Sequence, residues 1–165
     1  MEDSADDPLS ELDRFRAAFQ AATGEPPPDD AFGFGDSPVL QDELAALVVS
    51  GRKRATAALR ADLDHRGDEL PRPGQLAIVL DGRGAPVCVI RTTQVVVAPF
   101  RTVDARFAWD EGEGDRSLEH WLAEHRRFFQ GRCQQLGIRF SEDLPVVFER
   151  FEVTWPPSAP GAERP

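Results

Sequence analysis

Hydrophobic side chains recur every three or four residues in several segments, and this spacing predicts amphipathic helices. The first helix covers residues 8–22 and is stopped by Gly24. The second starts after Ser37, a residue type that caps helices, with Pro38 at the first helical position and Gly51 placed to end it. Each segment has one apolar stripe, so we expect both helices to pack one face against the core.

The longest helix is predicted toward the end of the chain, where Asp115 or Ser117 caps it and Gly137 ends it. Its apolar stripe consists of Leu118, Trp121, Leu122, His125, Phe128, Phe129, Cys133 and Leu136. Residues 102–109 predict a shorter helix before it. Residues 111–115, with two glycines among three acids, predict a loop between the two helices.

The predicted strands cluster in the second half of the chain. Residues 75–80 and 86–91, the latter running on to Ala98, are apolar runs separated by a glycine-rich turn, which predicts a hairpin. Residues 146–155 are rich in β-branched and aromatic side chains and predict a final strand. Residues 62–69 form a polar stretch. Helices and strands do not alternate as βαβ units, so the pattern favours an antiparallel α+β domain or a small barrel with helices outside.

The chain of 165 residues is long enough for one domain with a real core. We divide it into an acidic N-terminal tail, helix and proline-rich connector (1–31), a folded domain (32–155) and a proline-rich tail (156–165). The first seven residues and the final tail are expected to be disordered.

Composition and charge restrict the class of protein. No apolar run approaches the roughly 18 residues of a membrane span, and the acidic start is the opposite of a secretory signal. Two cysteines are too few for disulfide bonds to stabilise a fold of this size, so we expect the protein to act in a reducing cytoplasm. Residues 1–50 hold 12 acids and 2 bases, which accounts for the whole net charge of −10. The rest of the chain is neutral overall and has room for a local basic patch.

The basic residues are almost all of one type: 18 of the 19 are Arg. The exception is Lys53, in the motif Gly51-Arg-Lys-Arg-Ala-Thr56. Lys and Thr three residues apart share one side of a helical turn, where a partly buried Lys beside a hydroxyl is a plausible base and nucleophile pair. The alternative is a basic helix end that complements the helix dipole.

Other candidate groups lie later in the chain. Glu111, Glu113 and Asp115 could hold a carboxylate near the Lys, or favour the start of the following helix. The basic residues of 125–127 and Arg132 are either a phosphate-contacting stripe or the solvated face of a helix. Histidine and cysteine spacings match no metal motif, and no nucleotide-binding motif is present, so we expect no metal and no cofactor.

Several motifs in order resemble the ASCH domain family (activating signal cointegrator homology). They are Phe34-Gly-Asp-Ser-Pro38, Asp42-Glu-Leu44, Gly51-x-Lys-x-x-Thr56, Glu111-Gly-Glu-Gly-Asp115 with Ser117, Leu118 and Trp121, and Phe148-Glu-Arg-Phe151. The resemblance covers roughly residues 32–155 and is to the longer bacterial branch. It implies a PUA-like small β-barrel with flanking helices and an RNA-related role.

Some small members of the family are amidohydrolases that remove the acetyl group of N4-acetylcytidine with a Lys, a Thr and a later Glu. The resemblance therefore implies catalytic roles for Lys53, Thr56 and Glu113, with Glu111 as second choice for the acid. Another member has been described as a ribonuclease that relies on tyrosines, and this chain has none.

Our first hypothesis is hydrolysis of an acylated nucleoside, in which Thr56 attacks the acyl carbonyl or positions a water that does. Lys53 serves as base and then as acid, and Glu113 holds the Lys or the leaving nitrogen. The candidate binding residues are Ser37, Arg52, Arg54, Glu111 and Asp115. The alternatives are a non-catalytic module or ribonuclease that binds single-stranded RNA, and an interaction protein with a vestigial cleft. The oligomeric state is left open.

Overall fold

The computed structural model describes residues 9–157. The predicted disorder of residues 1–7 and of all but the first two residues of 156–165 falls outside this range. The described elements are α1 (Glu11–Thr23), β1 (Ala31–Phe32), α2 (Pro38–Val49), β2 (Ala55–Leu59), α3 (Arg60–Arg66), β3 (Leu76–Leu80), β4 (Pro86–Pro99), a 3-10 turn (Phe100–Thr102), α4 (Ala105–Glu111), α5 (Leu118–Leu136) and β5 (Pro145–Trp155).

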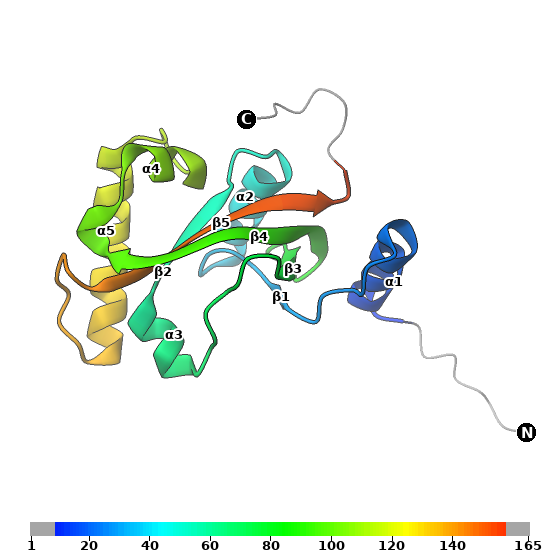
Figure 1. The fold of residues 1–165 in the computed structure, drawn as a ribbon, viewed down its shortest axis with the longest axis horizontal. Helices are drawn as coiled ribbons and strands as arrows, with labels where there is room; N and C mark the ends of the chain where they lie inside the picture. Colours follow the sequence, from blue (N-terminus) through cyan, green and yellow to red (C-terminus); the bar gives the residue numbers. More distant parts are fainter. Residues whose placement is uncertain (1–8, 158–165) are drawn as a thin grey trace, which may run out of the picture.

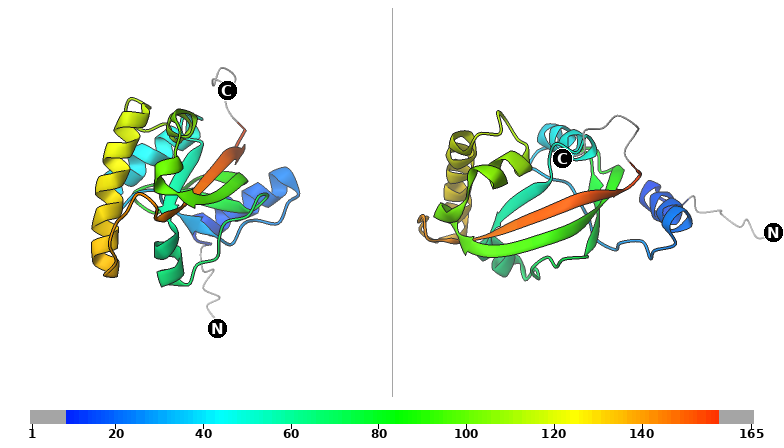
Figure 2. Two further views of the ribbon diagram at one scale, coloured as in Figure 1. Left: turned by 60° about the vertical axis from the view of Figure 1, so that its left-hand side comes forward. Right: turned by 45° about the horizontal axis from the view of Figure 1, so that its top comes forward.

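The strands form one five-stranded sheet in the order β1-β3-β4-β5-β2. The pairs β3–β4, β4–β5 and β5–β2 are antiparallel, and only the short β1 runs parallel to its neighbour β3. The long strands β4 and β5 lie side by side and curve across the molecule, with α5 at one end and α1 at the other (Figures 1 and 2). The predicted α+β class with helices outside the sheet is confirmed.

The helices cover the sheet in separate places, and each location follows from the alternation of side chains along the strands. Helices α4 and α5 pack against β2 and β5 through a core that includes Phe107, Trp121 and Phe148. Helix α2 packs on β3, β4 and β5 through Leu44 and Val48. Helix α1 covers the outer side of the β3–β4 pair through Phe19. Among the described helices, none is long and apolar enough to span a membrane.

The start of the motif segment differs from its predicted form. Residues 51–56 are not a helical turn: α2 ends before them and β2 begins at Ala55. The backbone is already extended at Arg54, whose carbonyl accepts a hydrogen bond from the amide of Phe151. Pairing with β5 therefore decides the local structure, although Ala-rich sequence is a weak strand former.

Two smaller differences lie in segments of mixed pattern. The polar stretch after β2 begins inside a helix, because α3 spans Arg60–Arg66 and ends at Gly67 in the left-handed conformation. The acidic segment predicted as a loop starts one residue later than expected, at Gly112, since Glu111 is the last residue of α4 and is buried. Both changes bring charged side chains onto helices that face the sheet.

Candidate functional site

Lys53 lies in the short connection between α2 and β2. The amides of Arg52 and Lys53 both donate to the carbonyl of Leu47, which folds the chain back over the end of α2. Gly51 makes this turn with φ of 78°, a value that most residues with a side chain avoid. Lys53 thus enters the protein interior directly before β2 starts, and its side chain is only 1% exposed.

The acidic segment is held against this connection by backbone contacts. Arg52 donates from Nε to the carbonyl of Gly112 and from a terminal nitrogen to the carbonyl of Gly114. The amide of Arg54 donates to the carbonyl of Asp110. Gly112 is required here, because a Cβ on it would lie 2.3 Å from the carbonyl oxygen of Arg52. Residues 60 positions apart in the sequence are thereby fixed side by side.

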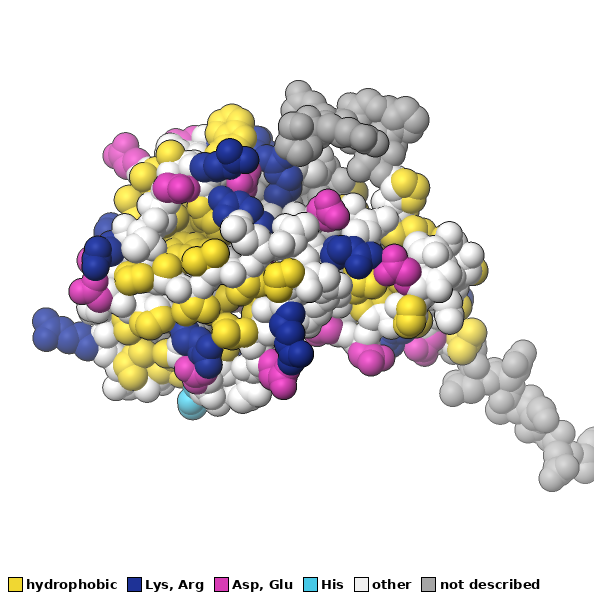
Figure 3. Space-filling view, in the orientation of Figure 1, with side chains coloured by type: hydrophobic (Ala, Val, Ile, Leu, Met, Phe, Trp, Pro, Cys, Tyr) yellow, Lys and Arg dark blue, Asp and Glu magenta, His cyan; other side chains and the backbone are white. Residues whose placement is uncertain are grey.

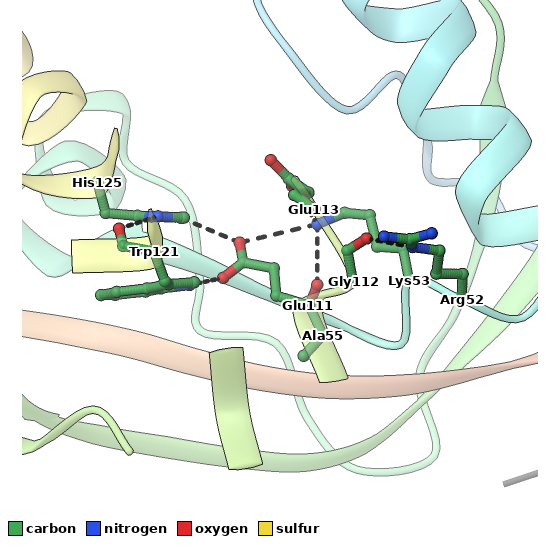
Figure 4. A network of polar contacts seen from close by, with 8 residues as sticks. All are labelled: Arg52, Lys53, Ala55, Glu111, Gly112, Glu113, Trp121 and His125. Carbon is green, nitrogen blue, oxygen red and sulfur yellow. Dashed lines mark hydrogen bonds and ion pairs between the residues drawn. The ribbon is translucent and has the colours of Figure 1, made fainter. Parts of the chain in front are cut away.

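The Lys53 ammonium meets oxygen atoms on several sides (Figure 4). Nζ donates hydrogen bonds to Glu113 Oε1 at 2.7 Å and to the carbonyl of Ala55 at 2.9 Å. Glu111 Oε1 forms a longer ion pair at 3.7 Å, and the Phe34 ring centre lies 5.3 Å away. Glu111 is buried, whereas the Glu113 side chain is 34% exposed. Of the two acids around the ammonium, Glu113 is therefore the one in contact with solvent.

Glu111 connects Lys53 to helix α5. The Trp121 indole N–H donates to Oε2, and His125 Nε2 lies 3.0 Å from Oε1. His125 also faces the Trp121 carbonyl through Nδ1 at 3.0 Å and stacks on its ring at 3.8 Å. Both ring nitrogens of His125 therefore face oxygen atoms.

By itself, burial in the protein interior would raise the pKa of Glu111. The charges of Lys53 and His125, together with the hydrogen bonds from His125 and Trp121, outweigh burial, so the pKa of Glu111 lies below its ordinary value. Glu111 is thus an ionised carboxylate inside the protein. A carboxylate buried in this way orients Lys53 and leaves Glu113 as the acid nearer to solvent.

Thr56 lies on β2 directly opposite Glu149 of β5. In the described part of the chain, no hydrogen bond joins Thr56 to Lys53, which differs from the predicted contact. The physical reason is that residues 53–56 do not form a helical turn: Lys53 lies in the connection folded back onto Leu47, whereas Thr56 belongs to β2 and pairs with Glu149. Lys53 and Glu113 are brought together, and Thr56 lies on the strand that follows.

Comparison with known proteins decides the family. The model of the ASCH domain matches residues 30–154. The chain belongs to the ASCH domain family. Its fold resembles the crystal structure of an ASCH domain from Lactobacillus crispatus JV V101, with a TM-score of 0.73 and 32% identity over 86% of this chain and 90% of that one. It also resembles a protein of Enterococcus faecalis V583, with a TM-score of 0.78 and 34% identity over 87% and 88% of the two chains. No curated protein matches the sequence.

The other predicted binding residues of this ASCH domain have structural contacts. Ser37 caps α2 by accepting the amide of Leu40, and Asp115 accepts the amide of Ser117. Hydrogen bonds from Ser117 lower the pKa of Asp115. Arg54 pairs with Asp110 at 3.0 Å. These residues, like Arg52, hold elements in place around Lys53, and their roles toward a ligand stay predictions.

The basic face of α5 differs from a phosphate-contacting stripe. His125 points inward to Glu111, while Arg126 and Arg127 pair with Glu142 and Glu124. Arg132 pairs with Asp62 of α3. Each of these arginines is therefore paired with a carboxylate in the structure.

Sequence reasoning missed two contributors to this ASCH site. His125 was read only as part of the helix stripe or the basic cluster, yet its position four residues after Trp121 places both on one helix face. Glu149 is the one acid at an alternating position among Val147, Phe151 and Val153, and this alternation is the signal that could have found it. Among residues 9–157, no group of three or more His, Cys, Asp or Glu side chains could hold a metal ion.

Proposed function

We propose that this ASCH protein is an amidohydrolase that removes the acyl group from an N4-acylated cytidine or a related nucleoside. The observation that carries the proposal is the pair formed by the buried Lys53 ammonium and the partly exposed Glu113 carboxylate, 2.7 Å apart. Amide hydrolysis needs one group that takes a proton from the nucleophile and one that gives a proton to the leaving nitrogen. A hydrogen-bonded carboxylate and ammonium supply both.

The ion pairs of Lys53 belong to its charged form, which favours a donor role at the start of the reaction rather than a base role. Glu113 takes a proton from a water whose oxygen attacks the acyl carbon. The carbon–nitrogen bond then breaks as the leaving nitrogen takes a proton from Lys53. Glu113 returns its proton to Lys53 across their hydrogen bond, so the sum is one amide and one water converted into a carboxylic acid and an amine.

Thr56 and Glu111 have supporting roles in this scheme. Thr56 is half-buried on β2, three residues after Lys53, and in this scheme its hydroxyl positions the attacking water. Glu111 holds the ammonium from the interior through the 3.7 Å ion pair. Both cysteines are free and buried, and burial raises the pKa of the Cys88 thiol to about 12, so neither competes as nucleophile. Action in a reducing cytoplasm stays a prediction.

The test is a screen of purified protein against N4-acylated cytidines and short single-stranded RNAs. We expect release of the acyl group from the nucleosides. Lys53→Arg keeps the positive charge but replaces the compact ammonium with a larger, planar guanidinium. Glu113→Gln removes the group that accepts the proton. Each variant is expected to lower kcat at least a hundredfold. Glu119→Gln, at an exposed site on α5, is the matched control and retains full activity.

Two results would refute the proposal. Full turnover by both the Lys53 and Glu113 variants would show that this pair does not catalyse the reaction. Tight RNA binding without release of any acyl group would assign the domain to RNA recognition instead.

A further inference from the structure

Glu149 is a half-buried carboxylate on β5 that the scheme above does not use. It faces Thr56 of β2 on one side and Val95 of β4 on the other, as their positions in the ladder require. Paired residues of antiparallel strands have Cβ atoms about 5 Å apart and share one face of the sheet. Glu149 and Thr56 therefore form neighbouring polar groups on that face.

One oxygen of Glu149 is fixed by the protein. Thr92, which is buried on β4, donates its hydroxyl to Oε1 at 2.6 Å. Among residues 9–157, this is the only hydrogen bond recorded for the Glu149 carboxyl. Oε2 is accordingly available to a ligand donor. Burial raises the pKa of Glu149, the hydrogen bond from Thr92 opposes this, and the negative charge of Asp30 adds to the rise.

The same face carries an aromatic wall that leads to Lys53. Phe151, two residues after Glu149, stacks on Phe34 with ring centres 5.5 Å apart and planes at 21°. The Lys53 ammonium lies 5.3 Å from the Phe34 ring centre. The aromatic pair is part of the core, with Phe34 7% and Phe151 3% exposed, and it connects the Glu149 carboxylate to the ammonium along one side of the sheet.

Apolar surface adjoins this face along β4. Val97 is 43% exposed, and Figure 3 shows hydrophobic side chains along the side of the molecule that β4 crosses. Val97 shares the orientation of Val95 and therefore extends the face beyond Glu149. A ligand placed there would contact apolar side chains and meet few competing polar groups apart from Glu149 and the two threonines.

We propose that Glu149, oriented by Thr92, is a specificity-determining residue that accepts a hydrogen bond from the amino group at position 4 of a cytosine-type base. The inference rests on the proposed function and names how its substrate is recognised. An acylated N4 keeps one hydrogen, which a carboxylate accepts. Uracil has an oxygen at the same position, and two acceptors facing each other repel.

The test is the binding of cytidine and uridine to the full chain, measured by calorimetry. The wild-type protein is expected to bind cytidine at least tenfold more tightly than uridine. Glu149→Gln can turn its amide to donate to the uracil oxygen, so the preference should fall about tenfold or more. Glu152→Gln changes an exposed acid three residues further along the same strand and should leave the preference unchanged. Retention of the wild-type preference by Glu149→Gln, or no binding of either nucleoside at millimolar concentration, would overturn the inference.

Turnover separates this inference from the proposed function. If N4-acetylcytidine is hydrolysed with the same KM by the wild type and Glu149→Gln, the function stands and the recognition role of Glu149 is refuted. If no acyl group is released but cytidine binds with a preference that Glu149→Gln removes, the recognition role stands and the hydrolase proposal fails. A rise in KM with nearly constant kcat supports both.

Discussion

Gly112 offers a sharp test of how the acidic segment is held against Lys53. It follows α4 with φ of 76°, and an alanine there would add a Cβ 2.3 Å from the Arg52 carbonyl oxygen and 3.0 Å from the Lys53 Cα. Both neighbours are backbone atoms, which cannot rotate away. Gly112→Ala therefore forces the connection before β2 and the end of α4 apart.

The expected cost has two parts. A residue with a side chain in the left-handed conformation costs about 1–2 kcal/mol, and overpacking against fixed atoms costs about 1–3 kcal/mol more. The sum is about 2–5 kcal/mol of unfolding free energy. Gly137, which ends α5 with φ of 69° and has nothing within 4 Å of its added Cβ, provides the matched control. Gly137→Ala bears only the first part.

Urea unfolding of the two variants and the wild type measures these costs. Gly112→Ala should lower the unfolding free energy by at least about 1 kcal/mol more than Gly137→Ala, the lower limit of the overpacking cost. Because Glu111 and Glu113 flank the glycine, the same variant should lose acyl-releasing activity that Gly137→Ala keeps. Equal destabilisation by both substitutions would show that the close approach to Arg52 is not important, and the reasoning would fail.

Two further predictions concern pH and salt. The folded-state pKa of Glu111 is lowered, so its contribution to stability is present above its ordinary pKa and is lost as the pH falls toward the folded-state value. Urea unfolding from about pH 7 to about pH 3 should therefore show a steeper loss of stability for the wild type than for Glu111→Gln, and parallel curves would contradict the assignment. A protein that follows an RNA strand loses affinity with a log–log slope near −0.7 per contacted phosphate. Since the arginines on α5 are matched by acids, KM for an acylated nucleoside should barely change between low and physiological salt, and a steep change would indicate phosphate contacts.

The long helices and strands could be predicted from local patterns. Ser37 and Ser117 begin α2 and α5 as their side chains indicate, and Gly137 follows the end of α5. The hairpin of β3 and β4 follows from its apolar runs and turn. These elements have strong caps or strong periodicity, so local physics agrees with the tertiary structure.

The site itself depends on contacts that no local pattern contains. β2 is Ala-rich and becomes a strand because β5 pairs with it, so Thr56 lies opposite Glu149 and not against Lys53 as in the predicted helical turn. The acidic loop suggested a carboxylate near Lys53, but the choice of Glu113 came only from the family resemblance, since spacing cannot relate residues 60 positions apart. That the His125 side chain points inward could not be predicted without knowing that the buried Glu111 lies against α5.

The burial of Lys53 has a practical consequence, because it is the sole lysine of the 165-residue chain. An amine-reactive label that modifies ε-amino groups has one target, and in the folded protein that target is 1% exposed. Labelling at this position therefore reports opening of the site without any engineered probe. A protease that cleaves after lysine has the same single target, so its cut divides the chain once, only when the connection before β2 has come away from the end of α4.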